Sequence, residues 1–309
     1  MMGDPSNITV LGAGLMGHGI ALIMARAGHN VVVTDPVPEA LAAVKGRVES
    51  SLSALGANAD EATRVLSCIA TEPEPGAAVS KADFAFEAAP EKLPLKRELF
   101  EQMEANAPTS AILASNTSVI QISKIVEGRS TAHRMLGTHW WNPAHMIPLV
   151  EVVKTDWTDS AAARSMFDLL QGAGKTPVMV EKDVPGFIGN RLQHALWREA
   201  ISLVENGICD AAAVDTVIKS SFGRRLAVLG PLENADLVGT DLTLDIHENV
   251  LFDLERSQEP SPYLKQLVDE GRLGMKSGEG FQKWTDEEME AVRTRVTSHL
   301  TKLETILSD

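Results

Sequence analysis

The sequence predicts an α/β protein in which a doubly wound, mostly parallel sheet is followed by an all-helical second part. Short apolar runs alternate with helical patterns through the first part of the chain, as a parallel sheet covered by helices requires. A glycine-rich turn joins the first run to the first helix. Beyond Val184, long helical patterns replace the alternation. We therefore expect one domain over residues 1–184 and a second over 185–309.

The elements of the first part follow from their apolar patterns. Residues 8–11 predict a strand, and the helical period of the residues after the glycine-rich turn predicts a helix that Gly28 ends. Residues 30–35 are rich in β-branched side chains and too short for a helix, so they predict a buried strand. The remaining expected elements are helices over 38–55, 93–106 and 119–125, and strands over 67–71, 83–88, 109–115, 134–139, 149–153 and 176–180.

The second part shows helical patterns separated by short polar or proline-containing connections. A proline-rich stretch, residues 259–262, is typical of such a connection. No internal repeat or low-complexity tract interrupts the pattern. The expected helices cover 187–205, 210–220, 231–254, 262–270 and 286–307.

Composition limits the classes of function. The 309 residues include 28 Lys and Arg against 42 Asp and Glu, a net charge of −14 that argues against a nucleic-acid partner. Cys68 and Cys209 lie far apart and match no metal or redox motif, which favours a reducing compartment. The first residues do not resemble a secretory leader, and no apolar run is long enough for a membrane span. We expect a cytoplasmic protein with a small-molecule substrate, without a bound metal and without a membrane partner.

Within the glycine-rich turn, Gly12, Gly14 and Gly17 fit the pattern G-x-G-x-x-G. In that pattern the first glycine makes the tight turn, the second lets a pyrophosphate approach the backbone, and the third lets helix and strand pack closely. Asp35 ends the next strand, where its carboxylate would bind the adenosine ribose and repel a 2′-phosphate. A Rossmann-type domain that binds NAD is the prediction, and an ordinary turn with a solvated aspartate is the alternative. The expected cofactor contacts here are Gly12, Gly14, Leu15, Met16, Gly17 and Asp35.

A histidine and a glutamate form the candidate catalytic pair. His139 stands at the end of a predicted strand, where open α/β sheets present catalytic groups. Glu151 lies inside the apolar strand 149–153, where an unpaired carboxylate would be costly. A pair solves this problem, because the carboxylate fixes the imidazole tautomer and stabilises the imidazolium formed when the ring accepts a proton. Upstream, the polar residues 115–118 either cap the next helix or deliver a hydroxyl to the substrate oxygen.

Several motifs in a fixed order extend these observations, and with them the chain resembles the L-3-hydroxyacyl-CoA dehydrogenase family from residue 8 to residue 284. That family also includes gulonate, carnitine and pyridine-carboxylate dehydrogenases. The matching segments, besides the glycine turn and Glu151, are EAAPE (87–91), ASNTS (114–118), HWWNP (139–143), DVPGFIGNR (183–191), GP (230–231) and LGMKSGEGF (273–281).

The resemblance implies an NAD-dependent dehydrogenase acting on a CH–OH group. It implies that His139 is the acid/base, that Glu151 orients it, and that Ser118 and Asn190 contact the substrate oxygen. It also implies a homodimer formed through the helical second part. Further cofactor contacts expected within the matched region are Glu91 and Lys96, beside the nicotinamide ribose, with Asn116, Ser118 and Asn142.

Departures from the family pattern leave the substrate open. The fatty-acid enzymes carry a lysine-rich helix that helps to hold CoA, and this chain has only Lys45 and Arg47 there. Arg224 and Arg225 stand where an apolar sequence is usual, and they suit a free carboxylate. His145 lies just beyond the catalytic turn and is a further candidate for substrate contact. The alternatives are a 3-hydroxyacyl-CoA, a small carboxylate-bearing alcohol or aldehyde, and a non-catalytic NAD-binding structural or sensing protein.

Overall fold

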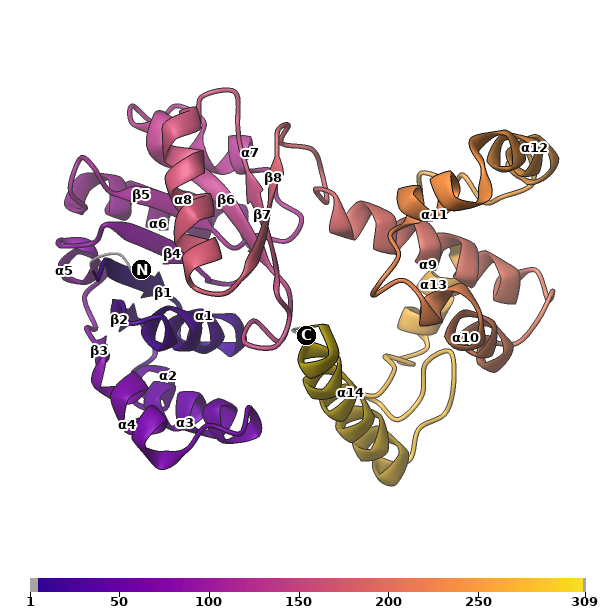
Figure 1. Ribbon diagram of the computed structural model, residues 1–309, viewed down its shortest axis with the longest axis horizontal. Coiled ribbons are helices and arrows are strands. Elements are labelled where there is room, and N and C mark those ends of the chain that lie inside the picture. The colour runs from indigo at the N-terminus through magenta and orange to yellow at the C-terminus, as the bar shows by residue number, and fades with distance from the viewer. Residues whose placement is uncertain (1–4, 308–309) are drawn as a thin grey trace. The chain divides into compact units, whose positions relative to one another are not determined.

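The computed structural model describes residues 5–307 and divides them into two compact units. An α/β unit comprises the residues up to Arg191 together with those from Leu300 onward, and a helical unit comprises Leu192–His299. Each unit is visible in Figure 1, with the sheet in indigo to pink and the later helices in orange to yellow. Among residues 5–307, none of the helices combines the length and apolar character that crossing a bilayer demands.

The α/β unit is built on one eight-stranded sheet with the order β3-β2-β1-β4-β5-β6-β7-β8. All neighbouring pairs are parallel except β6 and β7, which are antiparallel. This order confirms the predicted doubly wound, mostly parallel sheet. The strands are β1 (Asn7–Leu11), β2 (Asn30–Thr34), β3 (Ile69–Thr71), β4 (Phe84–Glu87), β5 (Ile112–Ser115), β6 (Met135–Trp140), β7 (Leu149–Val153) and β8 (Thr176–Val180).

Helices cover both faces of this sheet (Figure 1). The predicted single helix over 38–55 is wrong, because the chain forms two helices that meet at Ala43. A helix after Asn58 was not predicted, although the Asn58 side chain caps it by accepting from the Glu61 amide at 2.9 Å. The helices are α1 (Leu15–Arg26), α2 (Pro38–Ala42), α3 (Val44–Ala54), α4 (Ala59–Ser67), α5 (Pro75–Val79), α6 (Leu93–Asn106), α7 (Ile122–Val126), η1 (Ala132–Arg134) and α8 (Ser160–Gly172).

Two apolar clusters fill the two faces of the sheet. Successive residues of a strand point to opposite faces, so Val10 and Leu11 of β1 enter different clusters. The cluster around Val10 includes side chains of α1, α3 and α8, and the cluster around Leu11 includes side chains of α6 and α7. This packing fixes the carboxyl ends of β1, β4, β5 and β6 at one edge of the sheet.

The helical unit confirms most of the expected helices. The predicted helix over 231–254 is wrong as a single element, because Gly239 adopts a φ of +103° and separates two helices. A left-handed backbone conformation of this kind ends an α-helix and favours glycine. The elements are α9 (Gly189–Glu205), α10 (Ala211–Ser220), η2 (Phe222–Arg224), α11 (Pro231–Val238), α12 (Thr240–Val250), α13 (Pro262–Asp269) and α14 (Asp286–Leu307), of which α9 begins and α14 ends in the α/β unit.

Candidate active site

The glycine turn between β1 and α1 has the geometry of a dinucleotide cradle. Gly12 has a φ of +114°, and a Cβ there would lie 2.7 Å from the Ala88 carbonyl oxygen. At Gly17 a Cβ would lie 1.8 Å from the Gly12 carbonyl oxygen, whereas at Gly14 it would meet nothing within 4 Å. Two glycines are therefore required by packing, and the third leaves open space beside the free amides that begin α1. These residues fit a pyrophosphate bound at a helix N-terminus.

Asp35 lies directly after β2 and is fixed against this turn. Its Oδ2 accepts a hydrogen bond from the Ala13 amide at 2.7 Å, and its Oδ1 accepts one from the Val37 amide at 2.9 Å. Arg47 donates from Nη1 to the Ala13 carbonyl oxygen at 2.7 Å. Because a carboxylate oxygen can accept more than one hydrogen bond, the carboxylate retains capacity for ribose hydroxyls. Of the three predicted contacts inside α1, Leu15 is exposed, Met16 is partly buried and Gly17 is buried.

His139 and Glu151 form a buried pair across the antiparallel strands β6 and β7, where they occupy facing register positions. The His139 Nδ1 and the Glu151 Oε2 are 2.7 Å apart, and the exposed fractions of the two side chains are 4% and 1%. Since Nδ1 is engaged by the carboxylate, Nε2 is the ring nitrogen left to exchange a proton with a substrate.

The second oxygen of the Glu151 carboxylate holds the start of α9. Oε1 accepts from the backbone amides of Ile188 and Gly189 at 2.8 and 3.0 Å. Burial raises the pKa of Glu151, but the hydrogen bond from His139 and these two amides outweigh burial, so the pKa lies below its usual value. The carboxylate therefore stays ionised beside the imidazole.

Aromatic side chains surround the His139 ring. The ring centroids of Trp141 and Phe187 lie 5.2 and 5.6 Å from that of His139. Phe187 is buried with a φ of +50°, an uncommon conformation for a bulky residue. A Cβ at Gly189 would lie 2.4 Å from Trp141 Cζ2, so this glycine allows the Trp141 ring to pack here.

Ser118 and Asn190 are brought together from distant parts of the chain. The Asn190 Nδ2 donates to the Ser118 carbonyl oxygen at 2.9 Å. Asn116 accepts through Oδ1 from the Trp140 amide at 3.0 Å, which connects the segment after β5 to the strand that carries His139. Ser118 itself is exposed. The predicted substrate-oxygen contacts thus lie on segments that are hydrogen-bonded to one another.

Lys96 is buried in an ion-pair cluster with two glutamates. The Lys96 Nζ lies 2.9 Å from Glu87 Oε1 and 3.3 Å from Glu91 Oε2. Glu91 is partly exposed, whereas Glu87 and Lys96 are almost completely buried. Sequence reasoning gave no role to Glu87. The signal was available, because Glu87 ends an apolar strand just as Glu151 lies within one.

Two further predicted residues, Asn142 and His145, lie on the segment between β6 and β7. Asn142 is exposed, two residues beyond the end of β6. His145 packs against α1, where its ring centroid lies 5.9 Å from that of His18, and it lines a cavity of about 340 Å³. Burial, together with the nearby His18 and Lys175, lowers the pKa of His145 to about 4.

Arg224 and Arg225 are both exposed in the helical unit, at η2 and directly after it. Within residues 5–307, no set of three or more His, Cys, Asp or Glu side chains has the arrangement of a metal site.

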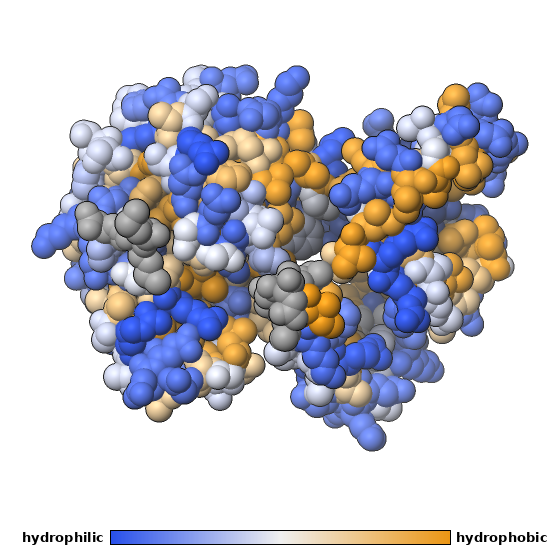
Figure 2. All heavy atoms as spheres, in the orientation of Figure 1, coloured by the Kyte–Doolittle hydropathy of each residue, from blue (hydrophilic) through white to orange (hydrophobic). Residues whose placement is uncertain are grey.

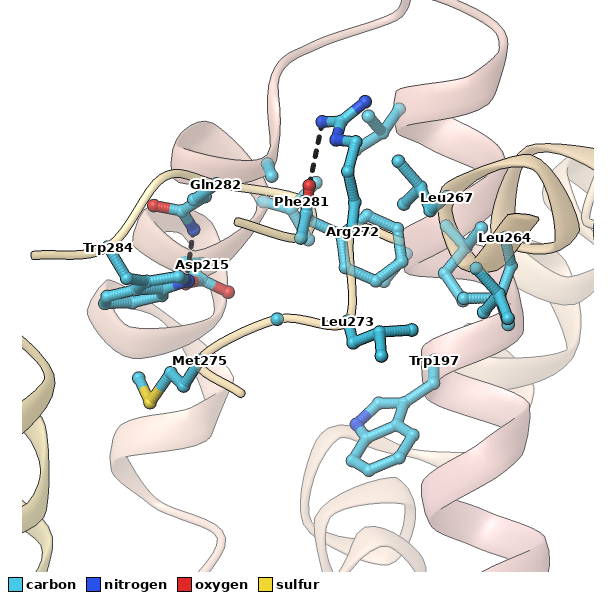
Figure 3. Close-up of a pocket in the computed structure, with 18 of the residues that line it drawn as sticks. Trp197, Asp215, Leu264, Leu267, Arg272, Leu273, Met275, Phe281, Gln282 and Trp284 are labelled. Atoms are coloured by element: carbon cyan, nitrogen blue, oxygen red, sulfur yellow. Dashed lines mark hydrogen bonds between the residues drawn. The ribbon is translucent and has the colours of Figure 1, made fainter. Parts of the chain in front are cut away.

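The helical unit contains an open cavity of about 690 Å³, lined by its own elements. Apolar side chains form most of its wall, among them Trp197, Leu264 and Phe281 (Figure 3). At its polar edge, the Gln282 Nε2 donates to the Asp215 Oδ2 at 3.3 Å. Among the described residues that line this cavity, none is a predicted cofactor, catalytic or substrate residue.

Two descriptions of one protein family match the chain. Residues 7–184 match the family described as "3-hydroxyacyl-CoA dehydrogenase, NAD binding domain". Residues 186–284 match "3-hydroxyacyl-CoA dehydrogenase, C-terminal domain". The fold and these matches define an NAD-dependent dehydrogenase that acts on CH–OH groups. The chain belongs to the 3-hydroxyacyl-CoA dehydrogenase family.

Individual relatives carry different names. The chain is 34% identical to 5-formyl-3-hydroxy-2-methylpyridine 4-carboxylate 5-dehydrogenase of Mesorhizobium japonicum, over 97% of this chain and 98% of that protein. It is 39% identical to the mitochondrial hydroxyacyl-coenzyme A dehydrogenase of Homo sapiens, over 90% and 91% of the two chains. A crystal structure of the pyridine-carboxylate enzyme, described as an NAD+-dependent dismutase, covers 98% of this chain and 99% of its own at 33% identity, with a TM-score of 0.90.

Proposed function

We propose that this dehydrogenase transfers a hydride between NAD and a small alcohol or aldehyde that carries a free carboxylate. The observation that supports the reaction is the buried His139–Glu151 pair at the edge of the sheet that also carries the glycine turn. NAD, when bound, supplies the hydride acceptor or donor. The chain's own residues then have to bind the alcohol, orient it and move one proton.

His139 performs the proton transfer in this proposal. In oxidation its Nε2 takes the hydroxyl proton as the carbinol carbon loses its hydride, and in reduction the protonated ring returns the proton to the carbonyl oxygen. Glu151 holds Nδ1 and stabilises the imidazolium. Ser118 and Asn190 contact the substrate oxygen, and the cofactor lies along Gly12, Gly14 and the residues that begin α1. The remaining predicted cofactor contacts are Asp35, Glu91, Lys96, Asn116, Ser118 and Asn142.

Two observations support a free carboxylate over a CoA thioester. The likeness to the pyridine-carboxylate enzyme extends over nearly the whole of both chains, with a TM-score of 0.90. The cations on α3 are Lys45 and Arg47, and Arg47 already donates to the glycine turn, which leaves little charge for the phosphates of CoA. Arg224 and Arg225 are the proposed carboxylate contacts, since within the described residues neither has an acidic partner.

A 3-hydroxyacyl-CoA is the second candidate substrate. It is favoured by the 39% identity to the human mitochondrial hydroxyacyl-coenzyme A dehydrogenase, which is higher than the 34% identity to the pyridine-carboxylate enzyme. In this alternative the same His139–Glu151 pair acts on the secondary alcohol at carbon 3, and the arginine pair has no role in the reaction.

The deciding experiment measures kcat/KM with NAD for 3-hydroxybutyryl-CoA, 3-hydroxybutyrate, gulonate, carnitine and a pyridine-carboxylate alcohol. We expect the best free acid to exceed the thioester by at least about 100-fold, because a buried site discriminates strongly against an unmatched polar group. Replacing Arg224 and Arg225 by Ala should then raise KM for that acid about tenfold, with Arg256→Ala as the exposed control. A thioester preferred by a similar factor would establish the second candidate.

We also propose that two copies of the chain associate through the helical unit. The observation that supports this association is the number of large apolar side chains that are exposed in the helical unit. Leu232, Leu237 and Phe252 are 79%, 73% and 75% exposed, and apolar side chains are prominent on the visible surface of this unit in Figure 2. A second copy would cover such a surface.

A cytoplasmic location is the remaining proposal. Cys68 and Cys209 are both free thiols, as a reducing compartment would keep them. Fractionation of the producing cell, followed by activity measurement, tests this proposal.

A further inference from the structure

We propose that Glu87, Glu91 and Lys96 act together as a positioning cluster that sets the geometry of the Ser118 segment. This inference rests on the proposed function, in which Ser118 contacts the substrate oxygen. Neither the sequence patterns nor the comparisons give Glu87 a role, and they imply only ribose contacts for the other two residues. The contacts of this cluster point instead toward the protein interior and toward the segment after β5.

The buried centre of the cluster is the Lys96 ammonium group. Lys96 Nζ lies 2.9 and 3.1 Å from the two carboxylate oxygens of Glu87, 3.3 Å from the Ala89 carbonyl oxygen and 3.3 Å from Glu91 Oε2. An ammonium group has three protons to donate, so these oxygens account for its full capacity. With 1% of its side chain exposed, Lys96 connects the two carboxylates to each other.

Glu87 connects this centre to the end of β5. Ser115 donates from Oγ to Glu87 Oε2 at 2.5 Å, and the Asn116 amide donates to the Glu87 carbonyl oxygen at 2.7 Å. Asn116 in turn accepts from the Trp140 amide, one residue beyond His139. Glu87 therefore fixes Ser115 and Asn116, where the chain leaves β5 toward Ser118.

Glu91 holds the segment itself. Its Oε1 accepts from the Thr117 hydroxyl at 2.5 Å and from the amides of Ser118, Val119 and Ile120 at 3.1, 3.1 and 3.3 Å. One carboxylate oxygen thus accepts hydrogen bonds from the amides of three consecutive residues. Burial raises the pKa of Glu91, but the Thr117 hydroxyl, the backbone amides and Lys96 outweigh it and lower the pKa, in agreement with an ionised acceptor.

The consequence for the reaction is geometric. Ser118 is exposed. Among the described residues, two side chains bond its backbone: the Glu91 carboxylate accepts from its amide, and the Asn190 side-chain amide donates to its carbonyl oxygen. Loss of the Glu91 charge would let residues 117–120 relax, and a displacement of about 1 Å can cost up to about 100-fold in rate. The effect should pass through Ser118 and lower kcat even when the cofactor is saturating.

The test is a double-mutant cycle between Glu91→Gln and Ser118→Ala in the full-length protein. We expect Glu91→Gln to lower kcat about tenfold, and the double variant to be no slower than Ser118→Ala by more than about twofold, because coupled residues are non-additive. The Kd for NADH, from fluorescence titration, reports separately on the predicted ribose contact of Glu91, so kcat is measured at saturating NAD. Glu98→Gln, at an exposed position of α6, is the matched control and should leave kcat and the NADH Kd unchanged.

A second measurement needs neither turnover nor cofactor. Hydrogen exchange of the amides of residues 118–120 in the free protein should be at least about tenfold faster in Glu91→Gln than in the wild type or in Glu98→Gln. Thr117→Val, which keeps the shape and removes the hydroxyl, should give the same result if Glu91→Gln folds poorly. Multiplicative losses of kcat, a tenfold rise in the NADH Kd with kcat unchanged, or unchanged exchange would each overturn the inference. If the wild type turned over no alcohol, the proposed function would fail, while the exchange measurement would still decide the role of the cluster.

Discussion

The α/β unit and the helical unit differ in how far their apolar side chains are buried and their polar groups are hydrogen-bonded. In the α/β unit, most strand residues are buried and the residues of the candidate site bond to one another within the unit. In the helical unit, all of whose residues 192–299 are described, only Leu267 and Gly280 are buried. The α/β unit therefore carries its own core, whereas most of the helical unit's apolar surface has no cover within the chain.

This difference teaches where the chemistry and the assembly of the protein should be sought. A site held by buried hydrogen bonds is preorganised and should depend on single residues. A surface of exposed apolar residues stabilises an assembly through the total area that it buries, so its effect should be seen in the association of copies. Four experiments test this contrast.

The largest expected effect is on the catalytic pair of the α/β unit. His139→Gln should lower kcat by about 10² to 10⁴, because the variant has no group that can exchange a proton with the substrate. NADH binding, measured by fluorescence titration, should be unaffected, since the glycine turn contains none of the His139 contacts. A variant that retained wild-type turnover would remove His139 from the mechanism.

The second effect is on the stability of the same unit. Lys96→Met should lower the free energy of unfolding by about 3–5 kcal/mol, because it leaves the buried Glu87 carboxylate without its cation. Urea unfolding followed by circular dichroism measures this loss. Lys92→Met, at an exposed position just before α6, is the control and should change stability by less than about 0.5 kcal/mol. A loss below about 1 kcal/mol for Lys96→Met would show that the cluster is not needed for folding.

The third experiment addresses the helical unit. Leu232→Asp combined with Phe252→Asp should raise the dissociation constant of the proposed dimer at least about 30-fold, since a charge would then be buried at the interface. Light scattering after size-exclusion chromatography gives the mass as a function of concentration. Trp157→Asp, on the α/β unit, is the control for the effect of adding charge at an exposed aromatic position. A wild type that is monomeric at every concentration would contradict the proposal directly.

The smallest expected effect is an acid sensitivity of the α/β unit. Burial, then His18 and Lys175, hold the pKa of His145 at about 4, below its ordinary value of 6.5. The unfolded chain therefore binds the proton more readily, so stability is unaffected above pH 6.5 and falls as the pH drops toward 4. Between pH 7 and pH 5 we expect His145 to account for a loss of about 2 kcal/mol. His145→Asn should flatten this part of the stability profile, measured by thermal unfolding, and an unchanged slope would contradict the assignment.

Local patterns were sufficient to predict most of the fold. Strands such as β7 and helices such as α6 and α14 have the predicted bounds, because each shows a clear period in its own residues. Besides the missed helix α4, two errors fall where the period continues across a backbone break. At Ala43 and Gly239 the apolar pattern runs on, but the chain turns between two helices. A period in the sequence does not reveal such a break when apolar residues recur at the same spacing on both sides of it.

The candidate site was predictable in part, for a related reason. His139 and Glu151 lie in motifs at strand ends, and a buried carboxylate by itself suggests a partner. The bonds from Ile188 and Gly189 to Glu151, and those from Ser118, Val119 and Ile120 to Glu91, depend on backbone amides, which carry no sequence signature. The uncommon φ of Phe187 is equally invisible, since it follows from the path of the chain into α9 and from packing beside His139.

The two oxygens of Glu151 have a consequence for how mutants of this protein should be interpreted. One oxygen orients the imidazole and the other anchors the first amides of α9, so a single side chain couples proton transfer to the exit of the chain from the sheet. Any replacement at this position perturbs reactivity and architecture at once. Inactivity of such a mutant is thus ambiguous, and only variants of the histidine itself can isolate the chemical step.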